Sequence, residues 1–260
     1  MIDIGVNFIN KSFRDDCDEV IQRALGAGVK QILVTGTSVA VSRQSFELAL
    51  RYPGVLYSTA GIHPHDAKSF DSNSLLELKE LLKNKEVVAV GECGLDFNRD
   101  FSPRKDQEEC FRALIELAVE LEKPLFLHQR DAHEKFMSIL ADYDLSKVKA
   151  VVHCFTGTEQ EAMDCLEAGF YIGITGWICD ERRGSHLKEF VTDIPLERLM
   201  IETDSPYLLP RNMRPKPKKG RNEPAFLGHV AKEIALCYGI PLEDFNKEVE
   251  KTAKNFFALA

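Results

Sequence analysis

Four short apolar segments of the sequence each lead into side chains that can bind a metal ion. The segments cover residues 87–92, 125–128, 150–153 and 199–202, and their polar ends are Glu92, His128, His153, and Glu202 followed by Asp204. A carboxylate at the end of a buried strand is costly unless it is paired or bound to a metal. Oxygen and nitrogen ligands together suit Mg²⁺, Mn²⁺ or Zn²⁺ better than copper or an iron–sulfur cluster. We therefore predict a divalent-metal site at Glu92, His128, His153 and Asp204.

Such a site predicts hydrolytic chemistry. A divalent metal lowers the pKa of a bound water and polarises the bond under attack. Asp204 is suited to orient or deprotonate the water, because it follows the last of the predicted strands. In the alternative interpretation, each polar residue is satisfied separately by a salt bridge or a hydrogen bond. Their occurrence at matching strand ends favours the shared site.

The elements that must position these residues form a regular alternation of strands and helices. Eight strands are predicted, at residues 2–7, 31–35, 55–61, 87–92, 125–128, 150–153, 171–174 and 199–202. Amphipathic helices are predicted at residues 15–27, 42–51, 74–83, 107–122, 132–141, 159–168, 184–191, 225–238 and 242–258. This pattern indicates parallel β-α units, and eight units fit one α/β TIM-type (β/α)8 barrel over residues 1–260. A doubly wound sheet is the alternative, but it binds at one switch point rather than at many strand tips.

Side-chain alternation supports the barrel. Inward and outward positions alternate along a strand, so Glu92, His128 and His153 each share a face with the apolar residues of their own strands. The first and third strands place Asn7 and His63 at the same mouth, where barrel enzymes hold their chemistry. Cys93 and Cys154 have the opposite parity. We expect these two cysteines to face the helices as small buried apolar groups.

Composition limits the partners and the compartment. The net charge of −8 gives no global basic field for nucleic acid, so only a local patch could attract it. The seven cysteines include no C-x-x-C pair, which favours a reducing cytoplasm over a disulfide framework. The sequence shows no signal-peptide pattern, and no apolar run approaches the roughly 18–20 residues that span a bilayer. We expect a cytoplasmic monomer without a membrane partner.

One local patch is basic. Residues 211–222 hold six cations and no acid, directly after the Asp204 strand tip, and could grip phosphates or form a solvated loop. Arg130, Arg221 and the pair Arg182 and Arg183 are also placed to meet phosphate. Four aromatic residues follow strand ends and could stack on unpaired bases or pack under the loops: Phe97, Phe155, Trp177 and Tyr207.

Five motifs of this chain together resemble the TatD family of metal-dependent nucleases. They are Gly91-Glu92-Cys93-Gly94-Leu95-Asp96, His128-Gln129-Arg130, His153-Cys154-Phe155-Thr156-Gly157, Glu202-Thr203-Asp204-Ser205-Pro206-Tyr207 and Arg221-Asn222-Glu223-Pro224, and Gly61-Ile62-His63-Pro64-His65 resembles the family's third-strand motif. The resemblance implies a metallo-dependent hydrolase barrel that cleaves phosphodiester bonds of nucleic acid. It also implies that Glu92 bridges metals, that His128, His153 and Asp204 act as ligands or base, and that cleavage runs 3′→5′.

The first strand departs from the wider superfamily pattern. Many members carry His-x-His there, whereas this chain has Gly5-Val6-Asn7. We therefore expect one metal, Mg²⁺ or alternatively Mn²⁺ or Zn²⁺, held by Glu92, His128 and His153, and a second position that is lost or weak. Asn7 could supply an amide oxygen. His63 could bind phosphate, act as an acid or cap its loop, and His65, one residue out of phase, ranks lower.

Three further acids have open roles. Asp96, Glu202 and Glu223 could bind a second metal, orient Arg130 or Arg221, or repel a misplaced phosphate, and Glu223 could instead cap a helix. The remaining histidines, His133, His186 and His229, are expected to be surface or packing residues.

Three hypotheses about function follow. The first is a metal-dependent exonuclease that trims single-stranded DNA or RNA, as in DNA repair. The second is a C–N or ester hydrolase, such as a D-aminoacyl-tRNA deacylase, although the missing His-x-His and the lack of a strand-borne Lys weaken its two-metal amidase version. The third is a non-catalytic binding protein, against which the retained metal-binding residues argue. The basic segment favours a nucleic-acid substrate for either enzyme.

Overall fold

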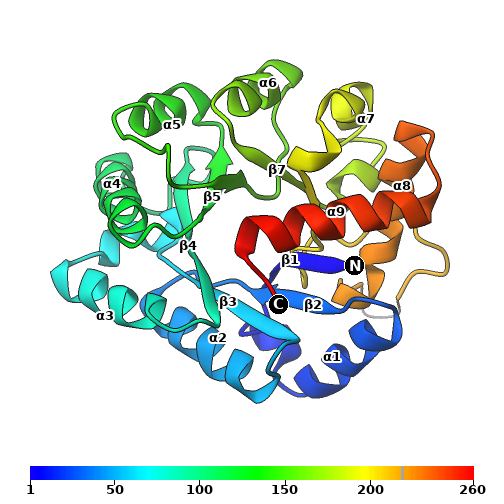
Figure 1. Cartoon of the computed structure of the whole chain (residues 1–260), viewed down its shortest axis with the longest axis horizontal. Coiled ribbons are helices and arrows are strands. Elements are labelled where there is room, and N and C mark those ends of the chain that lie inside the picture. Colours follow the sequence, from blue (N-terminus) through cyan, green and yellow to red (C-terminus); the bar gives the residue numbers. More distant parts are fainter. Residues whose placement is uncertain (218–219) are drawn as a thin grey trace.

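The computed structural model describes residues 1–217 and 220–260, and it contains one sheet of eight parallel strands. The strands follow one another in chain order around the sheet (Figure 1). They are β1 (Ile2–Val6), β2 (Gln31–Val34), β3 (Leu56–Ala60), β4 (Val87–Asp96), β5 (Leu125–Arg130), β6 (Ala150–Val152), β7 (Tyr171–Ile174) and β8 (Leu199–Ile201). The predicted barrel is confirmed, and the observed strands lie within a few residues of the predicted ones.

Backbone contacts beyond β8 close the barrel against β1. The amide of Asn7 donates to the carbonyl of Ser205 at 2.8 Å, and the amide of Asp204 donates to the carbonyl of Gly5 at 2.9 Å. Asn7 and Asp204 are thereby placed side by side, although 197 residues separate them in the sequence. The closure of the barrel therefore builds part of the site.

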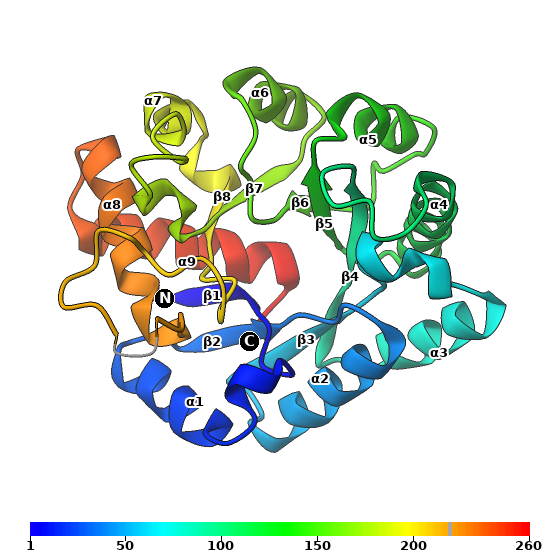
Figure 2. The same ribbon diagram turned by 180° about the vertical axis from the view of Figure 1, so that it is seen from behind.

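Helices surround the sheet (Figure 2). They are α1 (Cys17–Gly26), α2 (Val39–Arg51), α3 (Ser72–Leu82), α4 (Arg104–Leu121), α5 (His133–Leu140), α6 (Glu159–Glu167), α7 (Leu187–Phe190), α8 (Leu227–Tyr238) and α9 (Leu242–Phe257). None of these described helices is long and apolar enough to cross a membrane. The predicted helix at 184–191 is wrong in its first turn, because the amide of Gly184 donates to the carbonyl of Asp180 and holds a turn there.

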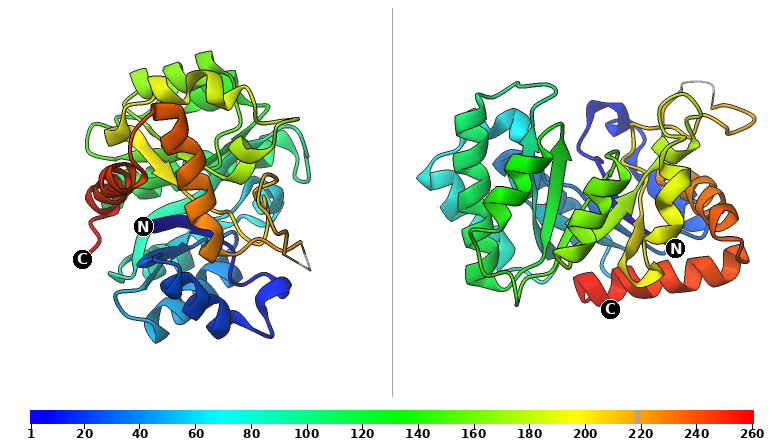
Figure 3. Two further views of the ribbon diagram at one scale, coloured as in Figure 1. Left: turned by 90° about the vertical axis from the view of Figure 1, so that its right-hand side faces the viewer. Right: turned by 90° about the horizontal axis from the view of Figure 1, so that it is seen from above.

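An apolar layer inside the barrel separates its two ends. It includes Ile4, Leu33, Phe126 and Met200, all of which are fully buried. Helix α9 lies across the N-terminal end of the strands, where Phe256 and its neighbours join the same layer (Figure 3). Because this end is filled and covered, the C-terminal ends of the strands are left as the open mouth.

Candidate active site

The mouth of the barrel holds a cavity of about 400 Å³. Its lining includes six of the predicted site residues: Asn7, His63, Glu92, His128, His153 and Asp204. Six different strands or the segments directly after them supply these side chains. The structure therefore brings the predicted metal and catalytic residues together.

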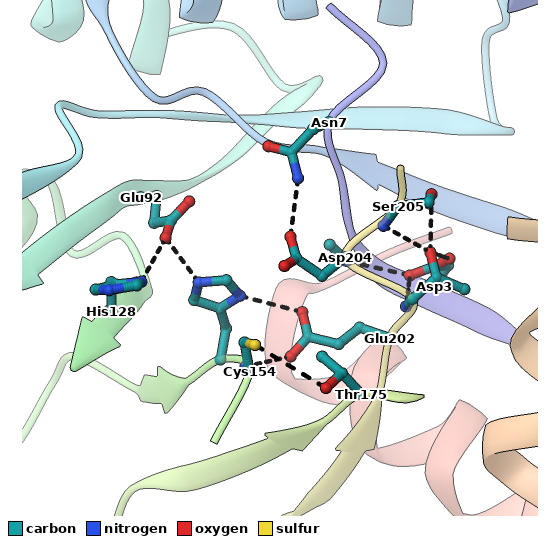
Figure 4. A network of polar contacts seen from close by, with 12 residues as sticks. Asp3, Asn7, Glu92, His128, Cys154, Thr175, Glu202, Asp204 and Ser205 are labelled. Carbon is teal, nitrogen blue, oxygen red and sulfur yellow. Dashed lines mark hydrogen bonds and ion pairs between the residues drawn. The ribbon is translucent and has the colours of Figure 1, made fainter. Parts of the chain in front are cut away.

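Glu92 lies at the centre of this group and is almost fully buried. Its Oε1 atom is 2.8 Å from Nε2 of His153, 2.9 Å from Nδ1 of His128 and 3.2 Å from Nε2 of His63. Figure 4 shows the contact between the side chains of Glu92 and His128. Three imidazoles thus converge on one carboxylate oxygen.

Two glycines let β4 carry Glu92 into the mouth. Gly91 and Gly94 both have φ of 142°, a backbone conformation that residues with a side chain rarely adopt. A Cβ atom would lie 2.2 Å from the carbonyl oxygen of Phe126 at Gly91, and 1.9 Å from that of His128 at Gly94. Glycine at these positions therefore allows β4 and β5 to approach closely with Glu92 and His128 facing one another.

The donor set fits a divalent metal ion. One ligand atom from each of His63, Glu92 and His128 lies within 4.8 Å of the others, and imidazole nitrogen with carboxylate oxygen suits such an ion. The buried Nε2 atom of His128 makes no hydrogen bond among the described residues and lies 3.5 Å from Oδ2 of Asp96. The group that meets this distance thus contains His63, whereas the predicted set contained His153 and Asp204. His153 remains in contact with Glu92.

The charged forms of Glu92 and His153 stabilise one another. Burial alone would raise the pKa of Glu92, but His153 above all outweighs this effect and holds the pKa well below its usual value. Burial likewise opposes the charged form of His153, yet Glu92 and Glu202 raise its pKa well above normal. The ring of Phe126 stacks on His153 with centroids 4.6 Å apart. The imidazole is therefore fixed by charge on both edges and by an apolar face.

Asp204 has the properties of a general base. The Asn7 side chain donates from Nδ2 to Oδ1 of Asp204 at 2.8 Å (Figure 4). Burial, together with the negative charges of Glu92 and Glu202, raises the pKa of Asp204 to about 7. A carboxylate with this pKa can accept a proton near neutral pH. Asn7 contacts it through the amide nitrogen, so it orients the carboxylate.

Comparisons with known proteins decide the family. The profile described as TatD related DNase matches residues 2–258 of this chain. The chain belongs to the TatD family. A protein of Erwinia billingiae named 3′-5′ ssDNA/RNA exonuclease TatD is 49% identical over 259 residues, which cover 100% of this chain and 99% of that protein. A protein of the same name from Salmonella typhimurium is 51% identical over 92% of both chains.

Solved TatD-family structures share the fold. The structure of YjjV, a TatD homologue from Escherichia coli, has a TM-score of 0.90 and 28% identity, covering 100% of this chain and 98% of that one. A TatD-family hydrolase from Entamoeba histolytica has a TM-score of 0.88 and 27% identity, with the same coverages. The family predicted from the sequence motifs is confirmed.

Two residues of this TatD-family chain reach the cavity against expectation. His65 lines it and lies with Nε2 2.7 Å from Oδ2 of Asp96, although it was ranked below His63. Cys154 also lines the cavity, so the expectation that it faces the helices is wrong, whereas Cys93 is buried in the core. The strand alternation ends before both residues, because a 3₁₀ helix begins at Pro64 and Cys154 has φ of 47°.

Two residues predicted to bind substrate are engaged elsewhere. Phe155 is 4% exposed and packs against Phe190, which favours packing under the loops over stacking on a base. The guanidinium of Arg221 pairs with Asp16 and Glu223, so both of its Nη atoms are engaged and its contact with phosphate stays a prediction. These pairings tie the end of the basic segment to the start of α1, where Arg23 of the helix also pairs with Asp16 and Glu223.

The remaining predictions at the mouth have mixed outcomes. Arg130 and Trp177 are half-buried and do not line the cavity, so their roles stay predictions. Tyr207 lines the cavity and is 52% exposed. Lys218 and Lys219, part of the predicted basic segment, lie outside the described residues. His133 and His186 make contacts with Asp164 and with loop carbonyls, as packing residues do.

The three acids with open roles also find partners. Glu202 accepts from the amide of Cys154 and faces Nδ1 of His153, so it positions a site residue. Asp96 faces His65, as described above. Glu223 pairs with Arg23 and Arg221 and makes no side-chain cap at the helix that follows it.

Proposed function

We propose that this TatD-family chain is a divalent-metal-dependent hydrolase that removes nucleotides from the 3′ end of single-stranded DNA or RNA. The observation that carries the proposal is the combination of full-length identity near one half with the relatives named for this activity and a cavity centred on Glu92. The narrower statements about polarity and strand preference come from the names of those relatives.

Each residue of the site has a role in this reaction. His63, Glu92 and His128 would hold the metal, with His153 as a further ligand, and we propose Mg²⁺ ahead of Mn²⁺ and Zn²⁺. When bound, the metal lowers the pKa of water and stabilises negative charge on the phosphate. Asp204 accepts the proton of the attacking water, and Asn7 holds the carboxylate in place. Glu202 fixes the orientation of His153 from the other side.

Burial of the centre explains a preference for single strands. Glu92 is 5% exposed and lies inside the cavity, so a reacting phosphate must enter the mouth to reach it. A free end or an unpaired strand can enter, whereas a cavity of about 400 Å³ does not have room for an intact duplex. The half-exposed ring of Tyr207 offers a stacking surface at the entrance.

The experiment is cleavage of a 5′-labelled single-stranded oligonucleotide with Mg²⁺. The proposal predicts a ladder that shortens from the 3′ end, and no ladder after EDTA treatment or in a Glu92→Ala variant. Glu109→Ala is the matched control, because Glu109 is 63% exposed on the outer helix α4. An intact strand under every metal, together with release of a D-amino acid from charged transfer RNA, would replace the nuclease with the deacylase.

We also propose that residues 1–260 act as one domain and as a monomer in the cytoplasm, in a process such as DNA repair. The single eight-stranded sheet and the family match over residues 2–258 support one domain. All seven cysteines are free thiols, which supports a reducing compartment. Sedimentation velocity tests the oligomeric state.

A further inference from the structure

A buried carboxylate beyond β7 gathers three arginines. The side chain of Asp180 is 4% exposed and follows the 3₁₀ helix Gly176–Cys179. Its Oδ2 atom is 2.9 Å from Nε of Arg183 and 3.0 Å from Nε of Arg211, and its Oδ1 atom is 3.6 Å from Nε of Arg182. One carboxylate therefore anchors guanidinium groups from two different loops.

The geometry leaves the outer atoms of these groups available. All three arginines approach Asp180 through Nε, and their Nη atoms have no hydrogen-bond partner among the residues that the structure describes. Their side chains are 66%, 52% and 51% exposed for Arg182, Arg183 and Arg211, respectively. The guanidinium of Arg183 also lies 4.3 Å from the Trp177 ring centroid, which restricts its motion.

The cluster carries excess positive charge. Asp180 and the exposed Glu181 are the two acids within this stretch, against Arg182, Arg183 and Arg211. One carboxylate carries a single negative charge and accepts few hydrogen bonds, so it cannot neutralise three guanidinium groups or engage all of their N–H donors. Planar guanidinium groups with free Nη atoms match the geometry of a phosphate. Arg221 offers a contrast, because both of its Nη atoms are already paired with carboxylates.

The cluster lies beside the mouth and outside the cavity. Thr175, which begins the 3₁₀ helix before Asp180, lies 3.9 Å through Oγ1 from Sγ of the cavity residue Cys154. Arg211 follows the cavity residue Tyr207 on the segment after β8, which runs beside the loop after β7 (Figure 2). A strand whose end occupies the cavity would therefore meet this cluster with a phosphate further along its backbone.

We infer that Arg182, Arg183 and Arg211, held by Asp180, form an outer subsite for a backbone phosphate on the 5′ side of the cleaved bond. The inference rests on the proposed function, because it needs a nucleic-acid strand in the cavity. It predicts that the arginines contribute to binding of substrates long enough to reach them and contribute nothing to shorter ones. A purely structural cluster would instead join the two loops without any dependence on substrate length.

The test compares a decathymidylate with a thymidine dinucleotide as substrates of an Arg183→Gln/Arg211→Gln variant. We expect KM for the decanucleotide to rise about tenfold, and the slope of log affinity against log salt to become shallower by about 0.7 for one lost phosphate contact. Values for the dinucleotide stay within about twofold, because it does not reach the cluster. Arg51→Gln/Arg112→Gln is the matched control, because it removes the same charge from arginines that each pair with one carboxylate on outer helices.

Two outcomes would overturn the inference: equal effects on both substrates, or an unchanged KM and salt slope for the decanucleotide. Arg182→Gln provides a second variant for the case of poor folding, because this side chain is the most exposed and makes the longest contact. Fluorescence anisotropy of the decanucleotide in EDTA, measured for wild type and variant, keeps the test independent of catalysis. Failure of the wild type to cleave either substrate would contradict the proposed function, while the anisotropy comparison would still decide the subsite.

Discussion

The Nδ1 atom of His153 lies 3.2 Å from Oε2 of Glu202, while the opposite ring nitrogen lies 2.8 Å from Oε1 of Glu92. One imidazole is therefore held between two buried carboxylates. Because the carboxylate of Glu202 accepts a hydrogen bond from Nδ1–H, Nε2 is presented to the centre of the site. This relationship fixes the ring more firmly than strand geometry alone.

Removing the contact between Glu202 and His153 should lower activity, although every residue that contacts the metal is kept. In a Glu202→Gln variant, the amide cannot accept from both His153 and the amide of Cys154. We expect activity and metal affinity to fall about 10–100-fold, as is typical when the partner of a metal-binding histidine is changed. Metal titration monitored by activity measures both, and activity equal to wild type would show that His153 needs no such partner.

The close approach of β4 and β5 predicts a stability effect at Gly94. A Gly94→Ala variant would place Cβ 1.9 Å from the carbonyl oxygen of His128, in addition to its strained φ of 142°. Gly54→Ala is the control, because Gly54 also has positive φ but nothing within 4 Å of the added atom. Urea unfolding should show a loss of about 1–2 kcal/mol for Gly54→Ala and a larger loss for Gly94→Ala. Similar losses would mean that the strands relax to fit the methyl group.

The raised pKa of the buried Asp3 side chain predicts that the stability of the protein depends on pH. It is completely buried, and burial raises its pKa to about 8, although its contacts with Thr203 act in the opposite direction. The folded state thus keeps a proton that the unfolded chain releases above its ordinary pKa of 3.8. The contribution of Asp3 to the free energy of unfolding is therefore lost progressively as pH rises from about 4 to about 8.

Urea titrations across this range test the Asp3 prediction. The free energy of unfolding of wild type should fall relative to that of an Asp3→Asn variant as the pH increases. A constant difference between the two proteins would show that Asp3 is ionised in the folded state at neutral pH.

Substitutions of Tyr207 and Phe155 should affect different properties, substrate binding for the first and stability for the second. Tyr207 is half-exposed and lines the cavity, so Tyr207→Ala should weaken binding of single strands by about 1–3 kcal/mol, the usual range for one stacked base. Phe155 is buried against Phe190, so Phe155→Leu should lower the melting temperature and leave KM unchanged. Steady-state kinetics and thermal melting of the two variants distinguish binding from stability. A raised KM for Phe155→Leu with an unchanged KM for Tyr207→Ala would show that the base stacks on Phe155.

Sequence reasoning located the residues that lie on the strands. Glu92 and His128 lie within β4 and β5, so their place near the strand ends could be predicted, although the pairing of these strands shifts in register between Gly91 and Cys93. His65 and Cys154 come after the strands end, where a 3₁₀ turn or a positive φ redirects the side chain. Local periodicity carries no signal for such turns, so the expectation for Cys154 was wrong and His65 was ranked below His63.

Pairings between distant residues were also beyond the sequence. Arg221 pairs with Asp16, which is 205 residues away, and only the closed fold shows that this cation is neutralised. The same holds for Arg211 and Asp180, which come from separate loops. Charge composition predicted a basic mouth, but the free and the engaged cations can be told apart only from the contacts.

The central claim is that Glu92 organises a divalent-metal site used for hydrolysis. The most direct measurement is titration of Mn²⁺ into wild type and a Glu92→Gln variant, with free Mn²⁺ followed by electron paramagnetic resonance. We predict that wild type binds Mn²⁺ and that the variant, which keeps the shape of the side chain but loses its charge, binds it at least about tenfold more weakly. Equal affinity in the two proteins would contradict the account and place the metal elsewhere.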